Sequence, residues 1–281
     1  MSNFLSPDQI TKHTEQVGIK KTSTGIFNSF MLAFMGGMFI ALASVGSIIA
    51  TCTIQNYSIA ALISGIVFAT GLMMVVIAGG ALFTGNVLII ISVLQKKVSI
   101  ISMAVNLGVS FIGNLVGALF TVVIIHFSGA LEGANGAVLA KLITKAAHKV
   151  EYPFSKAFLL GVLCNILVCL AVWMMSSAKD TSGKVLACFF PITLFILSGY
   201  EHIVANMYYI PAGILASMNA DYVKMSGVSG GIVSHITLGG LVDNFIPVLL
   251  GNFFGGIIIG VAYSTIYTVN NIKLPGIRKS N

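Results

Sequence analysis

The sequence predicts an all-α membrane protein with six transmembrane helices arranged as two related halves. The composition, two interrupted apolar segments and an internal repeat support this. Of the 281 residues, 57% are hydrophobic and 8% are charged, whereas soluble domains average about 45–50% apolar and about 25% charged residues. A spanning helix needs roughly 20 apolar residues, so the chain has room for about six. The composition excludes a water-soluble enzyme and a nucleic-acid partner, and indicates a lipid bilayer.

A polar N-terminal segment precedes the first apolar run. Ser6 followed by Pro7 predicts the start of a helix, because serine is a preferred cap and proline is tolerated in the first turn. A short amphipathic stretch follows, which predicts a helix lying at the membrane surface. It carries the lysines Lys12, Lys20 and Lys21.

The apolar segments that follow lie at about 27–51, 59–95, 102–128, 154–177, 186–217 and 241–269. The second and fifth are too long and too interrupted to be plain spans. The second contains the glycine-rich stretch 79–86, and the fifth contains 198–202 followed by Pro211. Irregular backbone at membrane depth is tolerated only where protein or a water-filled path surrounds it. We therefore expect broken helices in both segments.

An internal repeat relates the third and sixth segments. The shared residues have identical spacing and are Asn106, Gly113, Asn114 and Gly117 in one segment and Asn244, Gly251, Asn252 and Gly255 in the other. Two halves of three spans must face opposite ways, because three is odd. Inverted repeats of this kind place a substrate near the midplane, where the broken helices meet. The two GxxxG pairs predict close helix contacts, within a protomer or between protomers.

The basic residues predict the orientation. With an even number of spans, ten of the 15 lysines and arginines share the side of the termini and five lie on the other side. The positive-inside rule therefore predicts cytoplasmic termini. We expect a cytoplasmic N-terminal segment over 1–25, a six-helix transmembrane domain over 26–270 and a cytoplasmic tail over 271–281.

Four of the five outer lysines lie in or beside a single loop. Lys141, Lys145 and Lys149 recur every four residues, which predicts one face of a short helix. A cationic stripe at an outer mouth raises the local concentration of anions. A solvated surface helix is the alternative interpretation.

Glu201 and His202 form a titratable pair deep within an apolar segment. A charged acid at this depth costs at least about 2.5–3.5 kcal/mol, so such residues usually mark a pathway or a relay. The alternative is that both only hydrogen-bond a broken backbone, with Asn206 tying down the same turn. At the other break, Thr84 faces His202 if the two breaks meet. Otherwise the threonine bonds back to its own helix.

Four motifs, in the right order over about residues 20–270, resemble the formate/nitrite transporter family. They are Gly80–Thr84, Asn165–Met174, Ser198–Met207 and Asp243–Asn252. The resemblance implies an aquaporin-like fold, a homopentamer with one pore per protomer, and passage of small monovalent anions such as formate, nitrite or hydrosulfide. It also implies the cytoplasmic membrane of a prokaryote.

The same resemblance assigns roles to single residues. His202 matches the central pore histidine and Thr84 the loop threonine that faces it. Glu201 and Asn206 match the pair that orients the break. The remaining matches are hydrophobic constrictions at Phe68, Leu72, Leu82 and Phe195, a path lined by Asn165 and Val168, and a vestibule lysine at Lys149.

The transport chemistry implied by this site has two versions. A bare anion loses most of its hydration at an apolar constriction, at a cost of many kcal/mol, and imidazole titrates near neutral pH. Either His202 lends the anion a proton, which makes the proton a co-transported partner, or it acts only as a hydrogen-bond donor.

An aquaporin-like facilitator of small neutral solutes is the alternative function. Such a protein would carry Asn-Pro-Ala boxes at its breaks, and no Asn-Pro dipeptide occurs in the chain. The sequence has no HExxH, no CxxC and no Gly-rich phosphate loop of the usual form, so we expect no enzyme, cofactor or metal. Formate is the first expected substrate, with hydrosulfide close behind.

Overall fold

The computed structural model describes residues 4–268, in which every regular element is a helix apart from one isolated bridge between Phe4 and Ala178. The elements are α1 (Pro7–Ser23), α2 (Ile26–Thr51), α3 (Tyr57–Met74), η1 (Val75–Gly79), α4 (Phe83–Asn86), η2 (Val87–Ile89), α5 (Ile90–Leu94), α6 (Ile100–Phe127), η3 (Ala134–Gly136), α7 (Ala137–Val150), α8 (Phe154–Ser177), α9 (Thr181–Leu197), α10 (Ile203–Ala216), α11 (Ala220–Ser226), α12 (Gly230–Val233) and α13 (Leu238–Thr268).

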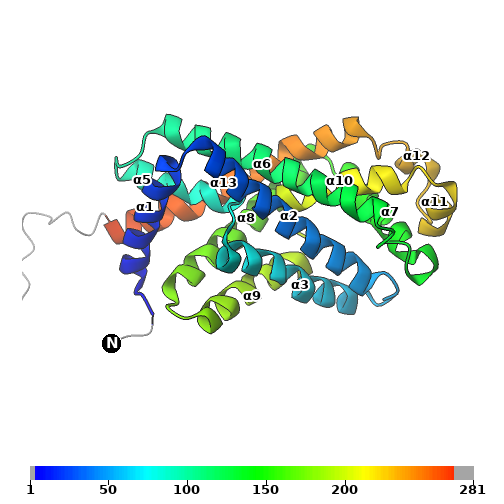
Figure 1. Ribbon diagram of the computed structural model, residues 1–281, viewed down its shortest axis with the longest axis horizontal. Coiled ribbons are helices and arrows are strands. Elements are labelled where there is room, and N and C mark those ends of the chain that lie inside the picture. Colours follow the sequence, from blue (N-terminus) through cyan, green and yellow to red (C-terminus); the bar gives the residue numbers. More distant parts are fainter. Residues whose placement is uncertain (1–3, 269–281) are drawn as a thin grey trace, which may run out of the picture.

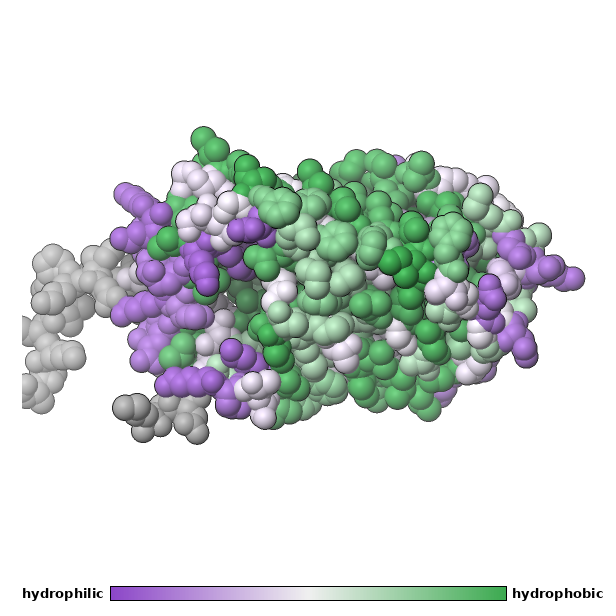
Figure 2. Space-filling view, viewed as in Figure 1, coloured by the Kyte–Doolittle hydropathy of each residue, from purple (hydrophilic) through white to green (hydrophobic). Residues whose placement is uncertain are grey.

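Within the described residues, five helices are long and apolar enough to cross a membrane. They are Ile26–Thr51, Tyr57–Gly79, Ile100–Phe127, Phe154–Ser177 and Leu238–Thr268. The apolar segment predicted at 186–217 contains most of one shorter apolar helix, α9, and the whole of another, α10. Figure 2 shows apolar side chains over the middle of the molecule and hydrophilic ones at its two ends. An apolar belt of this kind suits the hydrocarbon core of a bilayer.

Two segments change direction within the belt. α3 continues through the π-helical turn η1 to Gly79, whose φ is 98°, and the chain is then extended until α4 begins at Phe83. In the second segment α9 ends, Gly199 has a φ of 70°, and α10 begins at Ile203. Glycine adopts a positive φ without the steric cost of a side chain, which explains its place at both interruptions.

The GxxxG pairs lie in contacts between helices of the same protomer. A Cβ on Gly117 of α6 would lie 2.0 Å from the carbonyl oxygen of Phe34 in α2. A Cβ on Gly255 of α13 would lie 2.3 Å from the carbonyl oxygen of Val162 in α8. Only glycine permits backbones to approach this closely. The repeated spacing therefore serves two matched helix pairs, α2 with α6 and α8 with α13 (Figure 1).

The helices α1 and α7 lie at opposite ends of the molecule (Figure 1). α1 begins at Pro7 with Ser6 as its N-cap residue, which confirms the predicted start. α7 confirms the helix predicted from the lysine spacing. The predicted tail over 271–281 lies outside the described residues.

Candidate functional site

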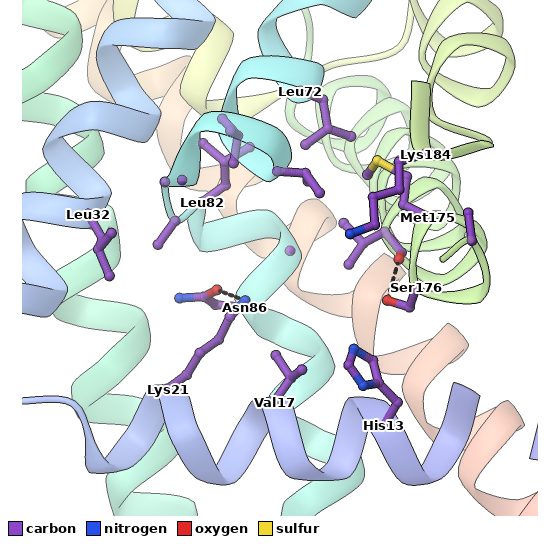
Figure 3. Close-up of a pocket in the computed structure, with 18 of the residues that line it drawn as sticks. His13, Val17, Lys21, Leu32, Leu72, Leu82, Asn86, Met175, Ser176 and Lys184 are labelled. Atoms are coloured by element: carbon purple, nitrogen blue, oxygen red, sulfur yellow. Dashed lines mark hydrogen bonds between the residues drawn. The ribbon is translucent and has the colours of Figure 1, made fainter. Parts of the chain in front are cut away.

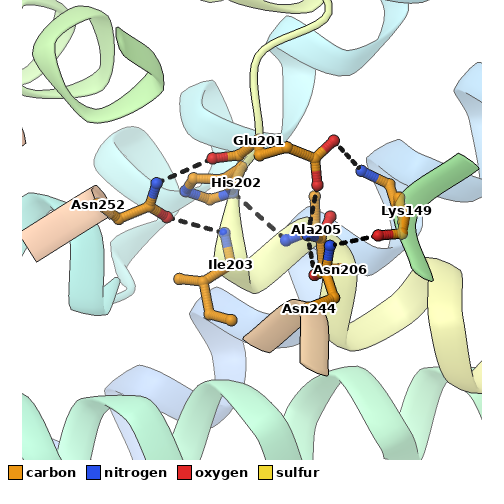
Figure 4. Close-up of polar contacts among 8 residues, drawn as sticks. All are labelled: Lys149, Glu201, His202, Ile203, Ala205, Asn206, Asn244 and Asn252. Carbon is orange, nitrogen blue, oxygen red and sulfur yellow. Dashed lines mark hydrogen bonds and ion pairs between the residues drawn. The ribbon is translucent and has the colours of Figure 1, made fainter. Parts of the chain in front are cut away.

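Thr84 and His202 meet at the junction of the two interrupted segments. The Thr84 Oγ1 atom lies 3.0 Å from His202 Nε2, and the two residues are 0% and 3% exposed. The threonine thus does not bond back to its own helix. The backbone N–H of Ala205 donates to His202 Nδ1 at 3.3 Å (Figure 4). Because Nδ1 accepts this bond, the single proton of a neutral imidazole resides on Nε2, which donates to Thr84. The threonine hydroxyl then keeps its own proton for a third group.

One buried asparagine holds each interruption in place. The Asn114 side chain accepts from the backbone N–H of Phe83 at 2.9 Å and donates to the carbonyl oxygens of Ala33 and Ala81 at 2.7 and 2.8 Å. The bonds to Phe83 and Ala81 satisfy polar backbone groups that a broken helix leaves without partners, and the bond to Ala33 ties the interruption to α2.

Asn252 does the same at the other interruption. Its side chain accepts from the backbone N–H of Ile203 at 2.8 Å and donates to the carbonyl oxygens of Gly161 and Glu201, each at 2.8 Å. The asparagines of the sequence repeat therefore have a structural role, which sequence reasoning missed. Their recurrence inside apolar helices was the available signal.

Glu201 faces away from His202 and belongs to a separate polar cluster (Figure 4). Its carboxylate pairs with Lys149 Nζ at 2.8 Å and accepts from Asn206 Nδ2 at 2.7 Å. The Asn206 amide also donates to Asn244 Oδ1 at 2.7 Å, and Asn244 Nδ2 donates to the carbonyl oxygen of Lys149 at 2.8 Å. The carboxylate thus has both a counter-charge and an amide donor, as a buried charge requires.

A ring of contacts with the same pattern surrounds the first interruption. Lys21 Nζ donates to Asn86 Oδ1 at 2.6 Å (Figure 3). Asn86 Nδ2 donates to Asn106 Oδ1 at 2.8 Å, and Asn106 Nδ2 donates to the carbonyl oxygen of Lys21 at 3.1 Å. No carboxylate takes part in these contacts. Burial lowers the pKa of Lys21 to about 8, because a partly dehydrated ammonium group is less stable.

Two cavities approach the Thr84–His202 pair. The cavity on the α1 side, here called the inner cavity, has a volume of about 500 Å³ and is lined by Leu72, Leu82 and Lys21 among others (Figure 3). The cavity on the α7 side, here called the outer cavity, has a volume of about 240 Å³ and is lined by Phe195 and His202 among others. The pair therefore connects the wall of the outer cavity to the loop that borders the inner one.

Apolar side chains lie beside both cavities. The rings of Phe68 and Phe195 meet edge to face with their centroids 5.6 Å apart, and the Phe195 centroid lies 5.9 Å from that of His202. Leu72 and Leu82 are buried beside the inner cavity. The four predicted constriction residues thus lie in two groups, near the outer and inner cavities.

Comparisons with known proteins agree over almost the whole chain. The profile described as "Formate/nitrite transporter" matches residues 8–266. The chain belongs to the formate/nitrite transporter family. Formate channel FocA of Escherichia coli strain K12 is 35% identical over 275 residues, which cover 96% of each protein. Formate channel FocA of Haemophilus influenzae is 38% identical over 267 residues, covering 92% of this chain and 93% of the relative.

Solved structures of the family share the fold. A pentameric formate channel with formate bound has a TM-score of 0.77 and 34% identity, and the match covers 86% of this chain and 97% of that one. An FNT family ion channel has a TM-score of 0.77 and 27% identity, with coverage of 90% and 97%. The resemblance inferred from the four motifs is therefore confirmed. This chain is an all-helical integral membrane protein, and these relatives are channels rather than enzymes.

Two predicted site residues lie on α8 beside the Thr84–His202 pair. Asn165 Nδ2 donates to the carbonyl oxygens of Thr84, at 3.2 Å, and of Asn252. Val168, three residues further along α8, is buried in the hydrophobic core. Asn165 therefore ties α8 to the first interruption and to α13, so the family motif on α8 supports the backbone that carries Thr84.

Sequence reasoning treated Lys21 as a surface lysine of the N-terminal segment, and it missed the partnership of Lys21 with Asn86. It also placed Lys149 at the vestibule without its partner Glu201, 52 residues away. Within residues 4–268, no group of three or more His, Cys, Asp or Glu side chains is arranged to hold a metal ion.

Proposed function

We propose that this chain is a transmembrane channel for small monovalent anions, with formate as the first expected substrate and nitrite and hydrosulfide within its range. The observation that carries the proposal is the buried 3.0 Å contact between Thr84 and His202, bordered by apolar side chains. A site of this kind offers hydrogen bonds to a small anion and has no negatively charged side chain to repel it, because the Glu201 carboxylate points elsewhere and is neutralised by Lys149.

The constrictions and the polar pair have separate tasks. Phe68 and Phe195 on the outer side and Leu72 and Leu82 on the inner side remove water from the ion, which costs many kcal/mol for a bare charge. The Thr84 hydroxyl then donates to the ion, while His202 Nε2 holds that hydroxyl in place. Asn165 and Val168 line the path beside them, and Glu201 and Asn206 orient the second interruption.

The hydrogen bond at Nδ1 supports the version in which His202 stays neutral. A second proton on the ring would occupy Nδ1, and the backbone N–H of Ala205 would then lose its acceptor at the start of α10. We therefore favour a donor role, with proton lending as the alternative to be tested.

The proposed architecture has six spans in two inverted repeats, with α9 and α10 together forming the fifth. The matching contacts of Asn114 and Asn252 support the repeat. We extend this to an aquaporin-like fold, to cytoplasmic segments over 1–25 and 271–281 flanking a channel domain over 26–270, and to the cytoplasmic membrane of a prokaryote. The pentameric formate channel supports a homopentamer with one pore per protomer.

The central test is formate uptake into proteoliposomes. We expect His202→Phe to slow uptake on the order of tenfold or more, since it removes the partner that orients Thr84. His126→Phe is the matched control, because His126 lies near the end of α6 and lines neither of these cavities. Normal uptake of both formate and formic acid by His202→Phe would contradict the site assignment.

Proton movement separates the two versions of the chemistry. A pH-sensitive dye inside the vesicles reports whether formate enters alone or as formic acid, which releases its proton after entry. Anion current without internal acidification is the result expected for a neutral His202. Acidification in step with uptake would support proton lending instead.

A further inference from the structure

A side cavity of about 230 Å³ adjoins the outer cavity, between α7 and the helices α2, α3, α9 and α10. Its lining includes Lys141, Lys145 and His148 from α7 and the hydroxyl groups of Ser47 and Ser64, which hydrogen-bond each other at 2.6 Å. No Asp or Glu side chain among residues 4–268 lines it. The cavity therefore carries basic side chains with no acidic side chain in its lining to neutralise them.

Lys145 is the cation that the two outer cavities share, because it lines both. Its Nζ atom lies 5.8 Å from the centroid of the Tyr209 ring. Within the part of the chain that the structure describes, Lys145 has no hydrogen-bond or ion-pair partner. Lys149, one turn further along α7, is 5% exposed and is neutralised by Glu201 at 2.8 Å.

His148, which also lines both outer cavities, does not supply this positive charge. Loss of water and the nearby lysines lower the pKa of His148 from its usual value of 6.5. This imidazole is therefore mostly neutral at pH 7. The uncompensated positive charge at the junction of the two outer cavities belongs to Lys145.

We propose that Lys145 is the centre of an anion-binding site in the outer vestibule, which takes a small monovalent oxyanion such as formate before the ion reaches His202. This inference rests on the proposed channel function. The ammonium group supplies the charge, and the Ser47–Ser64 pair supplies a polar wall on the opposite helices. The site is distinct from Lys149, whose charge already has a partner.

The charge state of Lys145 makes the site sensitive to pH. Loss of water and the charge of Lys149 lower the pKa of Lys145 to about 8, and Glu201 opposes this shift. The other titratable groups that line the two cavities are Lys141 and His148 on α7, His202, Tyr57 and Tyr152, and Tyr200 and Tyr209. A partly dehydrated cation gains stability from a bound anion, so binding weakens as the pH rises through about 8.

The test measures the half-saturating formate concentration for uptake through the α7 side, at low ionic strength. Lys145→Gln should raise it on the order of tenfold, as expected when a steering charge is removed. Lys224→Gln is the matched control, because Lys224 is an exposed lysine on α11 at the same end of the molecule. Lys145→Arg should keep the wild-type value at pH 7 and, unlike wild type, retain it at pH 9.

A binding measurement separates this inference from the channel function. Carbon-13 formate is titrated against the protein in lipid nanodiscs, and its line broadening is followed in wild type, His202→Phe and Lys145→Gln. Saturable binding that survives His202→Phe and disappears in Lys145→Gln supports the site, even if the wild type passes no formate. Equal half-saturation or equal binding in Lys145→Gln and Lys224→Gln would overturn it.

Discussion

The two interrupted segments share a backbone frame but differ in charge. Asn114 and Asn252 close the first and second interruptions with the same set of three hydrogen bonds. Beside each interruption, one lysine belongs to a cluster of hydrogen-bonded asparagines. Lys149 meets the carboxylate of Glu201, whereas Lys21 meets only the neutral amide of Asn86.

The residue just before the following helix also differs. It is His202 before α10 and Leu82 before α4. The same backbone arrangement therefore presents the hydrogen-bonding imidazole of His202 at the second interruption and the apolar side chain of Leu82 at the first. The comparison teaches that the amides determine the backbone, while the side chains at equivalent places determine the chemistry.

The difference in charge predicts the largest effect. Lys149→Met leaves Glu201 buried without a counter-charge, so we expect a loss of about 3–5 kcal/mol of stability. Lys21→Met removes a cation that has no anionic partner here, and we expect about 1 kcal/mol, because Asn86 loses one donor. Thermal unfolding in detergent measures both. The double variant Lys149→Met/Glu201→Leu should recover most of the loss, and equal losses for the two single variants would refute the comparison.

The shared frame predicts equal effects at the two asparagines. Asn114→Ala and Asn252→Ala each leave one buried N–H and one carbonyl group of an interruption without partners and remove a bond to a neighbouring helix, so we expect about 3 kcal/mol of destabilisation for each. The same unfolding assay measures both variants. A difference of more than about 1 kcal/mol between their losses of stability would show that the two interruptions depend on different contacts.

The glycine contacts predict a smaller effect on both helix pairs. Gly117→Ala and Gly255→Ala each place a methyl group against a backbone carbonyl, and we expect a loss of about 1–3 kcal/mol. Gly108→Ala on α6 is the control, because a Cβ there meets nothing within 4 Å. That control should gain about 0.5–1 kcal/mol. Unchanged stability of Gly117→Ala would contradict the close α2–α6 approach.

Lys21, the lysine without an ion pair beside the first interruption, also predicts a pH dependence of stability. Its pKa is about 8 when folded, below the ordinary value of 10.5, so the unfolded state binds more protons between these values. Stability therefore rises as the pH rises from about 8. Lys21→Met should flatten this rise but not remove the part contributed by Lys145, whose pKa is lowered in the same direction. An unchanged slope in Lys21→Met, measured by unfolding at pH 7 to 10, is the contrary result.

Local patterns in the sequence determined the helical membrane class, the helix that carries Lys141 and Lys145, and the family. Each of these depends on composition, on spacing of a few residues or on short motifs in order. Hydrophobic content and helical periodicity are properties of adjacent residues, and they hold whatever the helices pack against.

The tertiary structure alone decided which polar groups meet. It paired Lys149 with Glu201 and Lys21 with Asn86, and it placed both GxxxG pairs inside one protomer. It also showed that Lys145, unlike Lys149, lines both outer cavities and has no ion-pair partner among residues 4–268. These contacts join residues tens of positions apart, so they follow from how the helices pack and not from local spacing. A buried charge or amide is stable only with a partner, and the fold supplies that partner.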